Sequence, residues 1–350
     1  MVARNISLHP NDFRRQRDDD IRQLGQDVAE WLTTAQRGAT PGLTVPWAPQ
    51  GREYVGFGET FCRVLSWHKI HKLRNFNPLG WHVNRGEVER LKDGFQRFIG
   101  EALGDSDMPL SSSTWLRDYD VSPVSEYTAI DQKFETVTGG PTRVVLDFGS
   151  GIGRQALIWR YERTATALIS VDAIESLYIL QNELYTRVWG DSVSDYFTEP
   201  QRCRSAAEEL APGTIIHIPT WRLAWIPAER VDLVVCVQVL QELPETTLRY
   251  VLGQFRRVIR PGGLLYIRDN EFWTPEHRVR VGRELLRTGW HLAFRYPGNE
   301  GTDIEGVPRL WTYTGRDYGR YFRWPVRLKR LLLPSYNKSY RSWRDVGLPI

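Results

Sequence analysis

The chain of 350 residues has few cysteines and no long apolar run. Its three cysteines, Cys62, Cys203 and Cys236, are too few and too scattered for a disulfide framework or a zinc site. No segment approaches the ~20 consecutive apolar residues that a membrane-spanning helix requires. The N-terminal stretch MVARNISLHPNDFRRQRDDD is too polar for a signal peptide. We therefore expect a cytoplasmic protein.

Lysine is also scarce, and positive charge is concentrated at the end of the chain. Residues 315–350 carry nine basic and two acidic residues, a net charge of +7, whereas the whole chain carries +4. Aromatic residues are interleaved with the basic ones. Such a tail can lie on a membrane surface or a lipid-linked substrate, track nucleic acid, or fold back over a small-molecule pocket. We favour folding back or self-association into a homo-oligomer, then the membrane surface or lipid-linked substrate, and nucleic acid last.

The chain is long enough for one ligand-binding domain with a substantial extra segment. Its first 140 residues are predicted to be mostly helical, because apolar residues such as Val88, Leu91 and Phe95 share a helical face. Helices placed before the first buried strand would lie over the carboxyl ends of the strands, where open parallel sheets bind ligands. We predict a helical N-terminal cap or lid (1–140), a ligand-binding core (141–315) and a basic aromatic tail (316–350).

Residues 144–154, VVLDFGSGIGR, contain the most informative pattern in the chain. The apolar run suits a strand buried on both faces, and Gly149, Gly151 and Gly153 suit a tight turn with room for a ligand. The helix predicted to follow would direct its N-terminal N–H groups at that ligand. The third glycine falls one residue too early for the dinucleotide pattern G-x-G-x-x-G, and no G-K-[ST] follows.

The order of the next segments predicts the fold. A second strand, TALISVDAI, ends in Asp172, whose carboxylate could accept both hydroxyls of a ribose. A helix, a third strand near GTIIHIP and a fourth in VDLVVCV follow. A fifth strand comes after a Pro-Gly-Gly turn, and HLAFRYP and RLWTYTG are expected to pair as a hairpin. We predict an α/β, Rossmann-like three-layer sandwich with a seven-stranded, mostly parallel sheet and a helical N-terminal extension.

Four segments, DFGSGIG, Asp172, VDLVVCVQVLQEL and FRRVIRPGGLLYI, resemble the motifs of class I S-adenosylmethionine-dependent methyltransferases in the same order. The resemblance covers roughly residues 141–315 and implies S-adenosylmethionine as the cofactor. It implies that Asp147 orients the methionine part of the cofactor and that Asp172 contacts the ribose. The other implied contacts are Gly149, Ser150, Gly151, Gly153, Ala173 and Gln238. The words VLQEL and VDAIESLYILQNELY also resemble a group of sugar O-methyltransferases from natural-product pathways.

The third strand departs from the family's pattern. Relatives often have an Asp near its end, close to the adenine amino group, whereas this chain reads IPTWRLAWIP. Trp221 could stack on the adenine, and Thr220 could supply a hydrogen bond. The alternative for Trp221 is packing in the core or on a cap.

Methyl transfer to a hydroxyl needs alignment with the donor and a base near the attacking oxygen. Such a base should come from the loops after the fourth and fifth strands or from the lid. Glu242, Asp269 and His277 are the leading candidates. Glu242 could instead cap the next helix. Further candidates are Glu271 and, in the lid, His68, His71 and His82.

The pair Asp269–Asn270 resembles the metal-binding pair of metal-dependent O-methyltransferases. The third ligand of such sites belongs at the end of the fourth strand, where this chain has Cys236, Val237 and Gln238. Because that oxygen ligand is missing, we predict no metal site. The pair would otherwise form a turn.

The chain lacks the Asn/Asp-Pro-Pro-Tyr motif typical of methylation of base amino groups, and it has no recognisable nucleic-acid module. We therefore predict methyl transfer to a hydroxyl of a small molecule, a sugar or another natural product. A first alternative is an RNA or protein methyltransferase, supported only by the basic tail. A second is a non-catalytic binding or scaffold protein with the same fold, against which the intact glycines and Asp172 argue.

Overall fold

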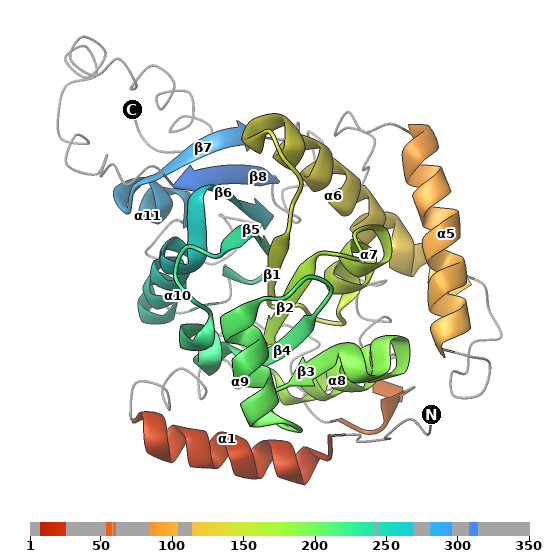
Figure 1. The fold of residues 1–350 in the computed structure, drawn as a ribbon, viewed down its shortest axis with the longest axis vertical. Helices are drawn as coiled ribbons and strands as arrows, with labels where there is room; N and C mark the ends of the chain where they lie inside the picture. Colours follow the sequence, from red (N-terminus) through yellow and green to blue (C-terminus); the bar gives the residue numbers. More distant parts are fainter. Residues whose placement is uncertain are drawn as a thin grey trace, which may run out of the picture.

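The computed structural model describes residues 8–25, 54–57, 59–60, 85–103, 114–240, 243, 245–268, 281–295 and 308–313. In this part of the chain, helices surround an eight-stranded sheet of order β3-β4-β2-β1-β5-β6-β8-β7 (Figure 1). The strands are β1 Val144–Phe148, β2 Ala167–Asp172, β3 Val193–Asp195, β4 Ile215–Pro219, β5 Val231–Val237, β6 Ile259–Arg268, β7 Trp290–Arg295 and β8 Arg309–Tyr313. The helices are α1 Pro10–Leu24, α5 Arg85–Leu103, α6 Thr114–Thr138, α7 Arg154–Glu162, α8 Glu175–Trp189, α9 Pro200–Glu209, α10 Glu245–Val258 and α11 Val281–Arg287, with the 3₁₀ helices η2 Gly190–Ser192 and η3 Thr220–Trp225.

The predicted α/β fold with a mostly parallel sheet is confirmed, and the predicted count of seven strands is wrong by one. The additional strand is β3, which pairs in parallel with β4 from Val193 to Asp195. Three residues are too few for a periodic pattern in the sequence. β8 runs antiparallel to both β6 and β7, so the expected hairpin of the last two strands is confirmed.

The predicted Pro-Gly-Gly turn lies inside β6. Val231 of β5 pairs with Ile259, and the next pair joins Leu233 to Leu264, so the residues between them bulge out of the ladder. Gly262 takes a φ of +79°, which glycine adopts without strain. The turn therefore forms a bulge within one strand rather than a connection before it.

Two layers of helices cover the sheet. Alternate strand residues point to opposite faces, so Val145 packs beneath one layer and Leu146 beneath the other. Helices α5, α6, α7 and α8 contribute to the first apolar core, and α9, α10 and α11 to the second. The result is the expected three-layer arrangement.

The N-terminal helices occupy two different places. α5 and α6 share the first core with sheet residues. α1 instead lies beside α8 (Figure 1) and packs against it through Phe13 and Tyr178. The division into cap, core and tail stays a prediction, and the tail 316–350 lies outside the described residues. Of the helices that the structure describes, none combines the length and apolar character needed to cross a membrane.

Candidate functional site

The turn after β1 is built on three glycines at left-handed backbone angles. Gly149, Gly151 and Gly153 have φ values of +70°, +58° and +73°, a region that residues with a Cβ rarely adopt. The N–H of Gly149 donates to the carbonyl oxygen of Val171 (2.8 Å), which fixes the turn to β2. Gly153 is the N-cap residue of α7, and among the described residues no side chain caps the N-terminus of that helix.

The three glycines differ in what surrounds them. A Cβ on Gly149 would lie 2.2 Å from a methyl carbon of Val239, and one on Gly153 would lie 2.7 Å from the hydroxyl of Tyr185. A Cβ on Gly151 would meet no atom of the described residues within 4 Å. Packing therefore requires Gly149 and Gly153, whereas Gly151 faces open space where a ligand can approach.

This difference predicts unequal effects of adding a methyl group. Gly149→Ala should lower the free energy of unfolding by about 1–3 kcal/mol, because it adds a clash to an unfavourable φ. Gly151→Ala has only the cost of the unfavourable φ, so its free energy of unfolding should fall by less. Chemical denaturation of both variants would measure the two losses. Adding Val239→Ala to Gly149→Ala should restore part of the loss. Equal losses at Gly149 and Gly151, with no restoration, would contradict the packing role of Gly149.

Asp147 is a buried carboxyl group with one free oxygen. It lies on β1 just before the glycine turn, is 4% exposed, and its Oδ2 receives no hydrogen bond from the described residues. Burial, together with the negative charges of Asp172 and Glu126, raises the pKa of Asp147 to about 7, although Ser150 and Arg154 act in the opposite direction. An unpaired buried carboxylate is costly, so this oxygen is suited to a cationic hydrogen-bond donor from a ligand.

Asp172 lies close to Asp147 but already has several partners. Its Oδ1 accepts hydrogen bonds from the backbone N–H groups of Ala173 (2.7 Å) and Ile174 (3.0 Å). Its Oδ2 accepts from the N–H of Gly151 (3.1 Å) and from Nε2 of Gln181 (3.0 Å). A carboxylate offers about four acceptor positions, so protein donors use them all. Asp172 therefore ties the glycine turn to the β2–α8 connection, and a ribose hydroxyl would have to share one of its oxygens.

The residues predicted near an adenine follow β4. Thr220 and Trp221 are the first residues of η3, and both are buried. The indole Nε1 of Trp221 donates to Oδ2 of Asp20 in α1 (2.7 Å), and the ring lies edge-on to Phe13 and Phe197. Trp221 is therefore part of the contact that docks α1, and its stacking on an adenine stays a prediction.

Gln238 ends β5 in a strained conformation. Its φ is +61°, and its N–H donates to the carbonyl oxygen of Arg268 in β6 (2.8 Å). Non-glycine residues at positive φ are uncommon, and such strain is concentrated at functional sites. The next residue, Val239, is the one that packs against Gly149, so the end of β5 adjoins the glycine turn.

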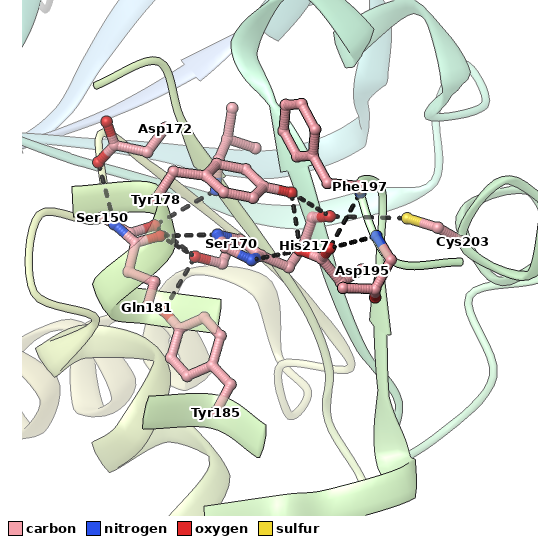
Figure 2. Close-up of polar contacts among 12 residues, drawn as sticks. Ser150, Ser170, Asp172, Tyr178, Gln181, Tyr185, Asp195, Phe197, Cys203 and His217 are labelled. Carbon is pink, nitrogen blue, oxygen red and sulfur yellow. Dashed lines mark hydrogen bonds and ion pairs between the residues drawn. The ribbon is translucent and has the colours of Figure 1, made fainter. Parts of the chain in front are cut away.

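Sequence analysis missed a buried polar row beside this turn. Strand register places Asp147 opposite Ser170, Ser170 opposite His217, and His217 opposite Asp195, across four adjacent strands. Gln181 of α8 lies against the row, and Figure 2 shows the hydrogen bonds that join it to Ser170 and His217. The only signal in the sequence was a polar residue interrupting a buried apolar strand, as in IIHIP.

A second buried charged group lies at the end of β6. Oε1 of Glu126 in α6 accepts hydrogen bonds from Nε of Arg268 (2.6 Å) and from the hydroxyl of Tyr266 (2.8 Å). Oε2 of Glu126 accepts from Gln155 in the first turn of α7 (3.3 Å). The Glu126–Arg268 pair connects α6 to the end of β6. A catalytic group was predicted in the loop that follows this strand.

The predicted catalytic residues cannot be placed. Glu242, Asp269, His277 and the further candidates Glu271, His68, His71 and His82 lie outside the described residues, as does Asn270. Within the described part of the chain, no group of three or more His, Cys, Asp or Glu side chains could hold a metal ion.

Residues 146–267 match a family model described as a methyltransferase domain. The magnesium protoporphyrin IX methyltransferase of Synechocystis PCC 6803, solved with bound S-adenosylmethionine, is 14% identical over 65% of this chain and 97% of its own, with a TM-score of 0.37. The N-methyltransferase NodS of Bradyrhizobium japonicum, solved with S-adenosylhomocysteine, is 15% identical over 64% of this chain and 98% of its own, with a TM-score of 0.36. No protein with a curated description matches the chain.

Proposed function

We propose that this chain, whose residues 146–267 match a methyltransferase-domain family model, is a class I S-adenosylmethionine-dependent methyltransferase that transfers a methyl group to a hydroxyl of a small molecule, a sugar or another natural product. The cofactor is S-adenosylmethionine. The observation that carries the cofactor site is the buried Oδ2 of Asp147, which has no hydrogen-bond partner in the described part of the chain, beside a glycine turn whose Gly151 faces open space there.

The residues fit the methionine end of the cofactor well. That end carries an ammonium group, and a charge-assisted hydrogen bond to Asp147 would supply the missing partner. Gly151 leaves room for the ligand backbone, and the uncapped N-terminus of α7 offers N–H groups to the carboxylate. The ribose end fits less freely. The acceptor positions of the Asp172 carboxylate are already used by protein donors, so a ribose hydroxyl would have to share one of its oxygens.

When bound, the cofactor supplies an electrophilic methyl group whose leaving group is a neutral thioether. The chain's own residues would bind and align it: Asp147 would accept a hydrogen bond from the ammonium, Asp172 would share an oxygen with the ribose, and Trp221 would border the adenine. Gln238, at a φ of +61°, would contact the cofactor from the segment that follows β5. Proton removal from the acceptor hydroxyl is assigned to one of Glu242, Asp269 and His277.

The acceptor assignment is tested by measuring S-adenosylhomocysteine release with panels of glycosides, other hydroxylated small molecules and amines, each with magnesium or with a chelator. Release with hydroxyl acceptors alone, unaffected by the chelator, is the expected result. Release only with amines would overturn O-methylation, and release only with RNA or protein would support that alternative. Absence of heat on titration with S-adenosylmethionine would support a scaffold instead.

The ribose contact gives a second prediction. Asp172→Ala should weaken S-adenosylmethionine binding by about 1–3 kcal/mol and also lower the stability of the cofactor-free protein, because buried donors lose their acceptor. Calorimetry and thermal denaturation would measure the two effects. Asp12→Ala, which removes an exposed carboxylate from α1, serves as the control. Lower stability with an unchanged dissociation constant would show that Asp172 only holds the turn together.

A further inference from the structure

The side chain of Gln181 occupies the centre of the buried polar row. It is fully buried in α8, and its Nε2 lies 2.5 Å from the carbonyl oxygen of Gly151 and 3.0 Å from Oδ2 of Asp172. Its Oε1 lies 3.0 Å from Nε2 of His217 and 3.2 Å from Oγ of Ser170 (Figure 2). The amide of Gln181 thus contacts Gly151 in the glycine turn, the carboxylate of Asp172 that is predicted to bind the ribose, and His217 in β4.

The hydrogen-bonding capacities of these groups fix the orientation of the amide. A backbone carbonyl and a carboxylate accept hydrogen bonds, so the amide nitrogen of Gln181 must face Gly151 and Asp172. The amide oxygen then faces His217 and Ser170 and requires a donor from one of them.

Ser170 has one hydroxyl hydrogen and two acceptors within reach, Oγ of Ser150 (2.8 Å) and Oε1 of Gln181 (3.2 Å). Nε2 of His217 lies closer to the amide oxygen of Gln181, at 3.0 Å. Two acceptors would repel each other at that distance, so His217 is a donor to this oxygen. Its Nε2 therefore carries the hydrogen.

The ring of His217 is held rigidly. It is fully buried and stacks on Tyr178 with ring centroids 3.7 Å apart. The hydroxyl of Tyr178 donates to Oδ2 of Asp195 (2.9 Å), and Oδ1 of Asp195 accepts from the N–H groups of Phe197 and Thr198 (both 2.9 Å). Nδ1 of His217 lies 2.9 Å from Asp195 but out of hydrogen-bond alignment, so the stacked tyrosine anchored to Asp195 holds the imidazole.

We propose that His217 is a positioning residue for the cofactor site: held by Tyr178 and Asp195, it locks the Gln181 amide and thereby orients Asp172 and Gly151. This inference rests on the proposed function of the turn. It places a determinant of cofactor affinity two strands away from the glycines, in a residue that touches neither cofactor nor acceptor.

The test compares two substitutions of His217. His217→Phe keeps a stacked ring and removes the donor; it should raise the dissociation constant and KM for S-adenosylmethionine about tenfold, with kcat changed less than about twofold. His217→Gln retains an N–H donor and should bind the cofactor within about twofold of the unaltered protein. Calorimetry separates weaker binding from partial misfolding. If only a fraction of a variant is folded, the measured number of binding sites falls while the dissociation constant stays the same. Gln181→Met, which removes the amide at similar size, carries the same expectation as His217→Phe should that variant not fold.

Two results would overturn the proposal. One is an unchanged dissociation constant in His217→Phe or Gln181→Met; the other is equal weakening in His217→Gln and His217→Phe. Long-range ¹H–¹⁵N spectra of the unaltered protein, with His217 assigned from the His217→Phe spectrum, should show hydrogen on Nε2. A bare Nε2 would also overturn it. Failure of the unaltered protein to bind S-adenosylmethionine would instead remove the proposed function, while the spectra would still decide the hydrogen-bond assignment.

Discussion

Asp147→Asn is expected to stabilise the cofactor-free protein above pH 7 and at the same time to weaken its binding of S-adenosylmethionine. Both effects have one cause: the carboxyl is buried, and its Oδ2 has no hydrogen-bond partner among the described residues. Asparagine keeps the size of the side chain and removes the charge. If Asp147 served only to stabilise the fold, its ionised carboxylate would not lower the free energy of unfolding.

The pH dependence of the stability effect follows from the raised pKa. Burial raises the pKa of Asp147 from 3.8 to about 7, so between these values the folded protein holds a proton that the unfolded chain releases. The contribution of this group is therefore present below pH 4 and lost as the pH rises through 7. At higher pH the ionised group costs on the order of 4 kcal/mol. Asp147→Asn should recover that amount at pH 8 and nothing at pH 4, as chemical denaturation at both pH values would show.

Binding should change in the opposite direction. Loss of a charge-assisted hydrogen bond to the cofactor ammonium costs about 1.5–3 kcal/mol, a weakening of roughly 10- to 150-fold in calorimetry. Asp232→Asn is the matched control, because Asp232 is buried in β5 yet accepts from the N–H groups of Arg143 and Val144 and pairs with Arg260. It should lose stability and keep its cofactor affinity. If Asp147→Asn behaves in the same way, Asp147 does not hold the cofactor.

The glycine turn shows how far the sequence alone leads. The strand, the acidic residue and the three glycines could be predicted, because each is a local requirement of a tight turn after a buried strand. Their separate roles could not. Val239 crowds Gly149 and Tyr185 crowds Gly153, and both side chains come from distant segments that meet the turn only in the folded chain.

The same reason explains why the polar row was missed. Ser170 and His217 each read as a single polar residue in an apolar segment, and Asp195 reads as one of several polar residues in GDSVSDYF; neither pattern singles out a site. Strand register places them at one level, and the helix α8 brings Gln181 against them. Register depends on long-range pairing, which the spacing of residues along one strand does not encode.

The predicted role of Asp172 was incomplete for a related reason. Its position at the end of β2 follows from the chain order, and the structure confirms that position. The four donors around its carboxylate depend on side-chain and backbone directions in three separate segments. The sequence therefore indicates where the carboxylate lies but not how much of its capacity the protein already uses.

Asp20→Ala is expected to release α1 from the domain. Asp20 is fully buried, and its carboxylate accepts hydrogen bonds from the hydroxyl of Tyr196 (2.7 Å), Nε1 of Trp221 (2.7 Å) and Nη2 of Arg222 (2.6 Å). Removing one partner of a buried ion pair costs about 3–5 kcal/mol, because the other charge is left without compensation. Arg222, whose side chain is 14% exposed, would lose its carboxylate partner.

The loss of stability should be confined to α1 and should not extend to the whole domain. Apart from Asp20, α1 is held mainly by Phe13 in an aromatic cluster and by Arg14, whose guanidinium pairs with Glu175 at the start of α8. Arg14 is half exposed, so solvent weakens this pair, which Arg17 joins at 3.7 Å from Glu175; together they hold α1 less firmly than the fully buried Asp20 does. We therefore expect faster proteolysis and faster amide exchange in α1, with slow exchange retained in β1 and β2.

Release of α1 should also weaken cofactor binding, because Asp20 fixes the indole of Trp221. Weaker S-adenosylmethionine binding in Asp20→Ala, together with an exposed α1, would link the N-terminal helix to the adenine side of the site. Asp19→Ala removes the neighbouring carboxylate, which pairs with Arg22 at the surface, and should change neither exchange nor affinity. If α1 of Asp20→Ala stays as protected as in the Asp19→Ala control, the buried carboxylate is not what holds the helix in place.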